Sequence, residues 1–149
     1  MPRPPFPAAV LDLLRRPQPA VMAVVRPDGS PVTAATWYLW VDDDSPAGGH
    51  VLVNLDAGRK RLEHLRGNPH VSLTVLGEDW YTHVTLLGRA TALTDDADLA
   101  DTDRISRHYG GQPYPVRDRP RVTARVEVDR WTAWGALHDA ADGAAGDAR

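Results

Sequence analysis

Residues 58–73 read Gly-Arg-Lys-Arg-Leu-Glu-His-Leu-Arg-Gly-Asn-Pro-His-Val-Ser-Leu. Leu62 and Leu65 have the i, i+3 spacing of one helix face, and Gly67-Asn68-Pro69 ends such a helix. The apolar run after the proline, His70 to Leu76, has the composition of a strand. This stretch therefore predicts a short helix that is inserted between strands.

Strand patterns continue on both sides of this helix. Pro27-Asp28-Gly29-Ser30 separates two runs rich in Val, Thr, Trp and Tyr, and Asp-Gly between such runs is a strong hairpin signal. The predicted strands cover 20–26, 31–41, 50–55, 70–76, 80–93 (with a bulge at Gly88) and 121–130, which leads into 131–134. Hairpin-linked strands with few helices favour a mainly β, antiparallel barrel over a parallel sheet.

Helices are predicted where capping residues precede helical spacing. The predicted helices cover 8–16, 57–67 with Asp56 as N-cap, and a segment from Thr94-Asp95-Asp96 to about Tyr109, followed by a loop at 110–120. We expect one domain over residues 1–137. The tail at 138–149 consists mainly of Ala, Asp and Gly, and we expect it to be disordered.

Composition excludes several classes of function. The 149 residues carry a formal net charge of −3, so the overall field does not favour nucleic acid or an anionic membrane. No apolar run reaches the length of a membrane span, and the proline-rich N-terminus does not resemble a secretory signal. Cysteine is absent, and the six histidines show no metal-ligand spacing, so we expect a cytoplasmic protein without a metal site.

A basic turn is the most informative chemical feature of the sequence. Arg59, Lys60 and Arg61 fall at the start of the helix predicted after Asp56, where each cation is disfavoured by about 0.3–1 kcal/mol. A bound phosphate or carboxylate would offset that repulsion, and Gly58 would let an anion approach the backbone. The alternative is a solvated helix face whose cations pair with Glu63 or Asp56. The sequence leaves both interpretations open.

The order of the elements carries a resemblance. It runs from the short first helix through the Pro-Asp-Gly-Ser hairpin and a strand ending Val51-Leu52-Val53-Asn54-Leu55 to the 58–73 stretch and then Leu87-Gly88-Arg89-Ala90. This order resembles the pyridoxamine phosphate oxidase-like, flavin-binding split barrel superfamily. More narrowly, it resembles the actinobacterial flavin and deazaflavin oxidoreductases that use coenzyme F420. The resemblance covers about residues 8–135.

The resemblance implies a six- to seven-stranded antiparallel split β-barrel with short helices, assembled as a homodimer with the cofactor at the subunit interface. It implies that Arg59 and Arg61, with Lys60 and Gly58, hold the cofactor phosphate. The strand at Val53, Asn54 and Leu55 would follow the cofactor tail, and Thr33 to Trp37 would pass beside the ring system. Trp80, with Tyr81 and His83, would come from the partner subunit. This chain departs from several relatives at Ala35 and Trp37, where they carry polar side chains.

The function that the resemblance implies is hydride transfer between reduced F420 and a small organic acceptor. Because the cofactor carries the difficult chemistry, no catalytic side chain is required, and none is assigned; Tyr81 and His83 are candidates for proton delivery. Arg66 and Arg89 are candidates for lining a longer basic groove. One alternative is an FMN-dependent oxidoreductase of the same fold, since both cofactors share a tricyclic head and a ribityl phosphate. Another is a non-catalytic cofactor-binding protein, in which the bulky Trp37 occupies the space above the ring.

Overall fold

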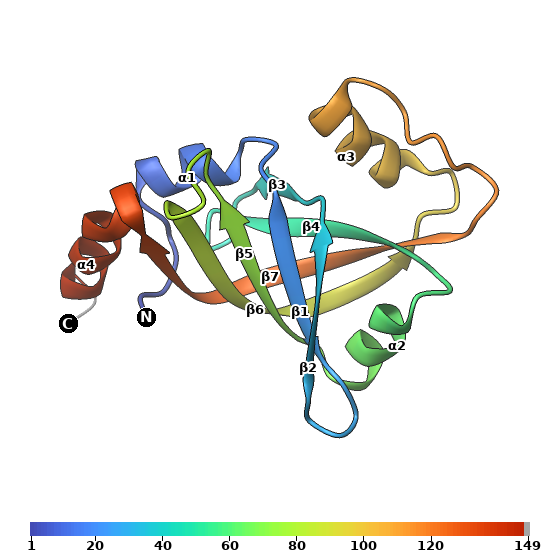
Figure 1. The fold of residues 1–149 in the computed structure, drawn as a ribbon, viewed down its shortest axis with the longest axis horizontal. Coiled ribbons are helices and arrows are strands. Elements are labelled where there is room, and N and C mark those ends of the chain that lie inside the picture. The colour runs from blue at the N-terminus through green and yellow to red at the C-terminus, as the bar shows by residue number, and fades with distance from the viewer. Residues whose placement is uncertain (148–149) are drawn as a thin grey trace.

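The computed structural model describes residues 1–147, and Figure 1 shows its helices and strands. The elements are α1 (Ala8–Leu14), β1 (Ala20–Val25), β2 (Pro31–Thr36), β3 (Leu39–Asp42), β4 (Gly49–Asp56), α2 (Lys60–Gly67), β5 (His70–Leu76), β6 (His83–Asp95), α3 (Ala100–Gly110), β7 (Arg121–Trp134), the 3-10 turn η1 (Gly135–Leu137) and α4 (His138–Asp147). Among the described residues, no helix has both the length and the apolar composition that crossing a bilayer requires.

All seven strands form one antiparallel sheet in the order β2-β1-β5-β6-β7-β4-β3, which confirms the mainly β split barrel. The long strands β6 and β7 form its middle, and their register shifts between Leu87 and Gly88, which confirms the bulge. A side chain at Gly88 would collide with the backbone carbonyl of Glu127. Apolar side chains that are almost fully buried fill the interior, among them Met22, Val53 and Trp131.

The predicted strand 31–41 is in fact two strands, and this corrects the sequence interpretation. β2 pairs with β1, whereas β3 pairs with β4 at the other edge of the sheet. The chain changes edge at Trp37 and Tyr38. Tyr38 is buried there; its phenol donates a hydrogen bond to the carbonyl of Arg16 (3.1 Å), and its N–H donates to the hydroxyl of Tyr109 (3.3 Å). These contacts replace the ladder bonds that an unbroken strand would make.

Both inserted helices begin later than predicted. Asp56 does not cap α2 but ends β4, and Arg59 occupies the N-cap position of α2. Leu62 and Leu65 are buried, as their spacing predicted, and fasten α2 to the barrel. Thr94 and Asp95 belong to β6, and α3 begins at Ala100.

Asp96 still caps α3, although it lies four positions before the helix. Its carboxylate accepts hydrogen bonds from the backbone N–H groups of Asp101 (3.1 Å) and Thr102 (2.9 Å). These are among the donors that a helix N-terminus leaves without an intrahelical partner. The buried carboxylate of Asp96 therefore fixes the start of α3.

The C-terminal segment differs from the expected disordered tail. Residues His138–Asp147 form helix α4, and its contacts with β7 keep it at the end of the barrel opposite α2 (Figure 1). Ala141 is buried in the main apolar cluster, and alanine is the strongest helix former, so composition and burial together stabilise a helix. The expectation for residues 148 and 149 lies outside the described residues.

Candidate functional site

A groove of about 730 Å³ opens at the end of the barrel that carries α2 and α3. Its walls come from the end of β2, the end of β4, the residues around the start of α2, and α3 with the segment that leads into β7. Its volume lies within the range of about 300–1,000 Å³ that is typical of small-molecule sites. Four arginines line it against one carboxylate, that of Asp56, so the groove is positively charged in an acidic protein.

Arg59 and Arg61 line the groove at the start of α2. The Nη1 atom of Arg61 is buried and has no hydrogen-bond partner within the described residues. Burial lowers the pKa of the Arg61 guanidinium, and the nearby charge of Arg59 lowers it further. A buried charge without a partner costs free energy, so this end of the groove lacks an acceptor that a bound anion would supply.

Asp56 and Arg119 form an ion pair at the same end. The carboxylate of Asp56 accepts a hydrogen bond from the N–H of Gly58 (2.8 Å), and its Oδ2 lies 2.6 Å from Nε of Arg119. The N–H of Gly58 is therefore already used by the protein. This pair neutralises Arg119 and leaves Arg59 and Arg61 with uncompensated charge.

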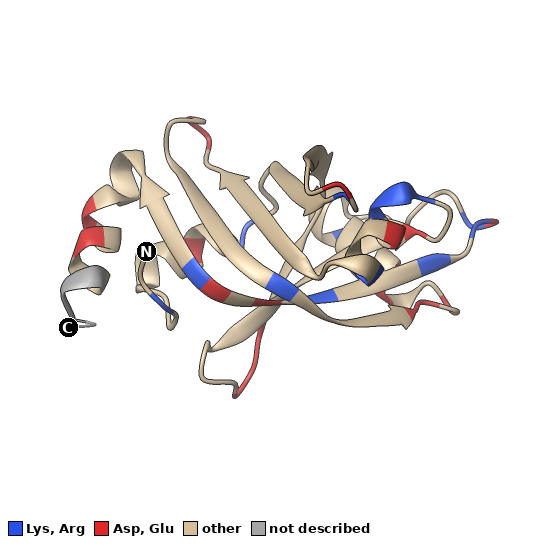
Figure 2. Cartoon of the chain, turned by 90° about the horizontal axis from the view of Figure 1, so that it is seen from below, with Lys and Arg blue, Asp and Glu red and all other residues tan. Residues whose placement is uncertain are grey.

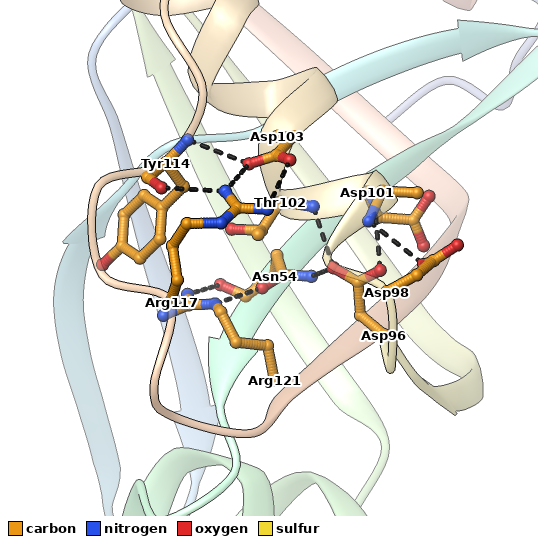
Figure 3. A network of polar contacts seen from close by, with 10 residues as sticks. Asn54, Asp96, Asp98, Asp101, Thr102, Asp103, Tyr114, Arg117 and Arg121 are labelled. Carbon is orange, nitrogen blue, oxygen red and sulfur yellow. Dashed lines mark hydrogen bonds and ion pairs between the residues drawn. The ribbon is translucent and has the colours of Figure 1, made fainter.

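A partly buried polar network supports the wall formed by β4 and β7 (Figure 3). The amide of Asn54 donates to Asp96 (3.0 Å) and to Thr123 (3.1 Å), and its Oδ1 accepts from Nε of Arg121 (2.6 Å). The guanidinium of Arg121 lies over the ring of Tyr114, 4.6 Å from the ring centroid. The network holds the Arg121 side chain in one position in the groove wall.

Two stacked aromatic rings form another part of the lining. The rings of Trp37 and Tyr109 lie 5.0 Å apart and almost parallel, and Trp37 remains 44% exposed. The hydroxyl of Tyr109 donates to the carbonyl of Gln18 (2.6 Å) and accepts from the N–H of Tyr38. Tyr109 thus ties α3 to the α1–β1 connection and to the point where the chain changes sheet edge.

The groove brings together half of the residues that the sequence analysis assigned to the cofactor. Arg59, Arg61, Asn54, Leu55 and Trp37 line it. The five others do not. Lys60 is exposed and pairs with Glu63, Gly58 lies beside Asp56, Val53 is buried in the core, Thr33 is exposed on β2, and Trp80 is 71% exposed on the β5–β6 connection.

The structure also places the residues that were only candidates. Trp80 and Tyr81 are in edge-to-face contact, and Tyr81 in turn contacts Trp134 near α4, at the end of the barrel opposite α2. The ring of His83 lies against the carbonyls of Trp80 and Tyr81. Within one chain these residues are therefore remote from the groove, and only a partner subunit would bring them to it.

Of the two extra arginine candidates, Arg89 pairs with Asp129 at 2.8 Å, and Arg66 is exposed on α2; neither lines the groove. Sequence reasoning missed Arg119, Arg121, Tyr109 and Tyr114. The sequence analysis predicted a loop at 110–120 and assigned none of its residues to the site. The alternation of Arg117, Arg119 and Arg121 was the available signal.

Lys and Arg gather at the groove end, whereas Asp residues mark α4 at the opposite end (Figure 2). Within residues 1–147, no group of three or more His, Asp or Glu side chains is arranged to hold a metal ion. The chemistry that the groove offers is therefore anion binding beside aromatic rings.

Comparisons with known proteins agree with this geometry. The sequence model of the pyridoxamine 5'-phosphate oxidase family matches residues 6–135. No curated protein matches the chain. Solved structures with the same fold include an F420 reductase, which is 24% identical, with a TM-score of 0.74 and coverage of 85% of this chain and 98% of that one.

Two further structures extend the comparison. The conserved hypothetical protein Rv2991 from Mycobacterium tuberculosis is 22% identical, with a TM-score of 0.66 and coverage of 89% and 86%. General Stress Protein 26 from Bacillus anthracis is 16% identical, with a TM-score of 0.59 and coverage of 84% and 90%. At these identities the likeness establishes the fold.

Proposed function

The chain belongs to the pyridoxamine 5'-phosphate oxidase family, and from this premise we propose that it is an F420-dependent oxidoreductase. It transfers a hydride between the reduced deazaflavin and a small organic acceptor. The similarity to an F420 reductase supports this choice among the chemistries that the family fold carries. We further propose that the protein is cytoplasmic.

The observation that carries the proposal is the Nη1 atom of Arg61, which lies in the groove without a hydrogen-bond partner among residues 1–147. A cofactor phosphate would accept from this atom and would also compensate the charge of Arg59. The groove volume, its excess of arginine and its exposed indole fit a ligand with a planar ring and an acidic tail.

A bound deazaflavin supplies the hydride, so the chain has to bind, orient and shield it. Arg59 and Arg61 hold the acidic end. Trp37 offers the face of its indole, which the stack on Tyr109 keeps from rotating. Burial raises the pKa of Tyr109 to about 12, so its hydroxyl stays protonated at neutral pH and acts as a fixed structural donor.

FMN is the second candidate cofactor, because the same arginines would bind its ribityl phosphate. The absence of a polar side chain at Ala35 and Trp37 leaves ring recognition to backbone groups and to stacking, which both ring systems allow. We propose F420 first because an F420 reductase shares the fold over nearly its whole length.

We also propose that two copies assemble through the outer face of β1, β5 and β6. Val21 and Leu87 are each 37% exposed on these strands, and Leu87 also lines a hollow of about 360 Å³, together with Ala23, Val25 and Ser72 among others. Exposed apolar patches of this kind mark protein–protein contacts. We further propose that, in this homodimer, Trp80 of the partner subunit lies near the cofactor.

One titration tests the cofactor. The purified protein is titrated with F420 and with FMN while cofactor and tryptophan fluorescence are followed, and its mass is measured by light scattering. We expect tight F420 binding, weaker FMN binding and a dimer. The reverse order of affinity would identify an FMN enzyme. Binding without turnover of any acceptor would identify a cofactor carrier. Binding of neither cofactor would refute the proposal.

A further inference from the structure

Arg121 differs from the other arginines of its segment in the partner that it bonds. Arg117 pairs with Asp103 at 2.9 Å, Arg119 with Asp56, and Arg125 with Asp43 at 3.3 Å. Within the described residues, Arg121 forms no ion pair. Its Nε and Nη2 donate instead to the side-chain and backbone oxygens of Asn54, at 2.6 and 3.2 Å. Its positive charge is therefore held in place without being neutralised.

Asn54 keeps Arg121 separate from a nearby carboxylate. Asp96 is buried, and its oxygens accept from the two N–H groups at the start of α3 and from Nδ2 of Asn54. The amide of Asn54 presents its donor to Asp96 and its acceptor to Arg121 (Figure 3). The helix N-terminus stabilises the negative charge, while the neutral amide orients the cation.

We propose that Arg121 binds an acidic group of a ligand in the groove and that Asn54 is the positioning residue that prepares it. The guanidinium is fixed along one edge, where Nε and Nη2 bond Asn54, and on one face by Tyr114, so little conformational entropy is lost when an anion binds. The ligand class is an anion with a carboxylate or a phosphate. The further statement that this ligand is F420, or the acceptor that F420 reduces, rests on the proposed function.

Two pairs of probes test this on the full-length protein. Riboflavin and FMN differ only in the phosphate, and the ribityl deazaflavin without a phosphate differs from F420 in the phosphate and the acidic tail. We expect Arg121→Gln to weaken FMN or F420 binding by about tenfold or more, with less than about a twofold change for the uncharged partners. Arg121→Lys should restore part of the loss, because it keeps the charge without the fork.

Asn54→Asp tests the positioning role with almost no change of shape. It would put a carboxylate beside Arg121 and neutralise it, and it would also remove the donor to Asp96. The preference for charged over uncharged probes should fall although Arg121 is intact, and a urea denaturation curve checks that the variant is folded. The matched control is Arg66→Gln, because Arg66 is an exposed arginine on α2 outside the groove. We expect the control to leave all affinities unchanged.

The two sources of the acidic group give different results. If the acidic group belongs to the cofactor, Arg121→Gln changes the dissociation constants for FMN or F420. If it belongs to the acceptor, Arg121→Gln leaves these constants unchanged but raises KM for a carboxylate acceptor relative to its methyl ester, at constant kcat. Equal effects of Arg121→Gln on charged and uncharged ligands, or a loss of stability alone, would overturn the proposal.

Failure of the proposed function is recognised separately. Should the native protein bind neither cofactor, inorganic phosphate is added while the arginine Nε–H resonances are followed by NMR. We then expect the Arg121 resonance to shift in the native protein and to shift less in Asn54→Asp. A shift confined to Arg59 and Arg61 would refute the role of Arg121.

Discussion

Asp56 and Arg119 join the end of β4 to the segment before β7 through an ion pair of 2.6 Å between Oδ2 and Nε. The carboxylate is largely buried and the guanidinium is 58% exposed, so the pair lies at the rim of the groove. Because the same carboxylate also accepts from the N–H of Gly58, it fixes the turn into α2. This one acidic side chain therefore affects both stability and ligand charge.

Asp56→Ala should change stability and anion affinity in opposite directions. We expect the free energy of unfolding to fall by about 1–3 kcal/mol, because the N–H of Gly58 loses its acceptor. Phosphate affinity should rise, since Arg119 then adds an uncompensated charge to the groove. Urea denaturation and FMN titration measure the two effects. Lys60→Ala, which removes an exposed pair, is the control and should cost less than about 1 kcal/mol.

Arg61→Ala should have the opposite effects, with stability kept and cofactor affinity lowered. Arg61 is partly buried beside Arg59, and its Nη1 has no hydrogen-bond partner in the part of the chain that the structure describes, so removing this cation should leave the thermal midpoint of the ligand-free protein unchanged or higher. Cofactor affinity should fall by about tenfold or more, since a charge-assisted hydrogen bond is lost. Calorimetry and fluorescence titration provide the comparison. A clear drop in the ligand-free midpoint would mean that Arg61 has a structural partner.

We expect the folded protein to lose stability at high pH because of Tyr109. Burial raises the pKa of its phenol from 10.0 to about 12, so the folded state disfavours ionisation. The stabilisation is complete below pH 10 and is lost as pH rises towards about 12. Urea midpoints at about pH 9 and pH 11 should differ less in Tyr109→Phe than in the native protein. An equal difference in both proteins would assign the loss to other groups.

Tyr109→Phe should also be less stable at neutral pH, by about 1–3 kcal/mol, because the carbonyl of Gln18 and the N–H of Tyr38 lose their partner. Circular dichroism during urea denaturation checks this. The stack on Trp37 is retained, so tryptophan fluorescence should change little in the folded protein. A marked spectral change would show that the hydroxyl also orients the indole.

Gly88→Ala should destabilise the barrel by about 1–3 kcal/mol or more, because the added methyl meets the backbone of Glu127 at the bulge. Gly67→Ala is the matched control. No atom lies within 4 Å of a Cβ built there, and the residue ends a helix, so the change should be neutral or stabilising by up to about 1 kcal/mol. Thermal denaturation of both variants distinguishes steric conflict from a general effect of glycine replacement.

Local pattern was sufficient for most of the fold. The Asp-Gly turn and the spacing of Leu62 and Leu65 each reflect interactions between residues that lie close in sequence, so they could be predicted. The break after β2 could not, because the partners of Tyr38 are Arg16 and Tyr109, which lie far away in the chain.

The site was predictable only in part, for the same reason. Arg59 and Arg61 stood out because they occupy an unfavourable position for a cation at a helix start. Arg121 occupies an ordinary position at the start of a strand, and its distinction is a neutral partner 67 residues away. A contact between residues so far apart in the chain cannot be predicted from the local sequence.

The two residues between β2 and β3 also determine which segments of this fold can tolerate insertions. They link the two edges of the sheet, and both are held, Trp37 by stacking and Tyr38 by its hydrogen bonds. An insertion there would displace both edges together. The exposed segment before β7 forms the facing wall, and its length can change at little cost. Evolution towards bulkier ligands should therefore lengthen that segment and conserve the two-residue link.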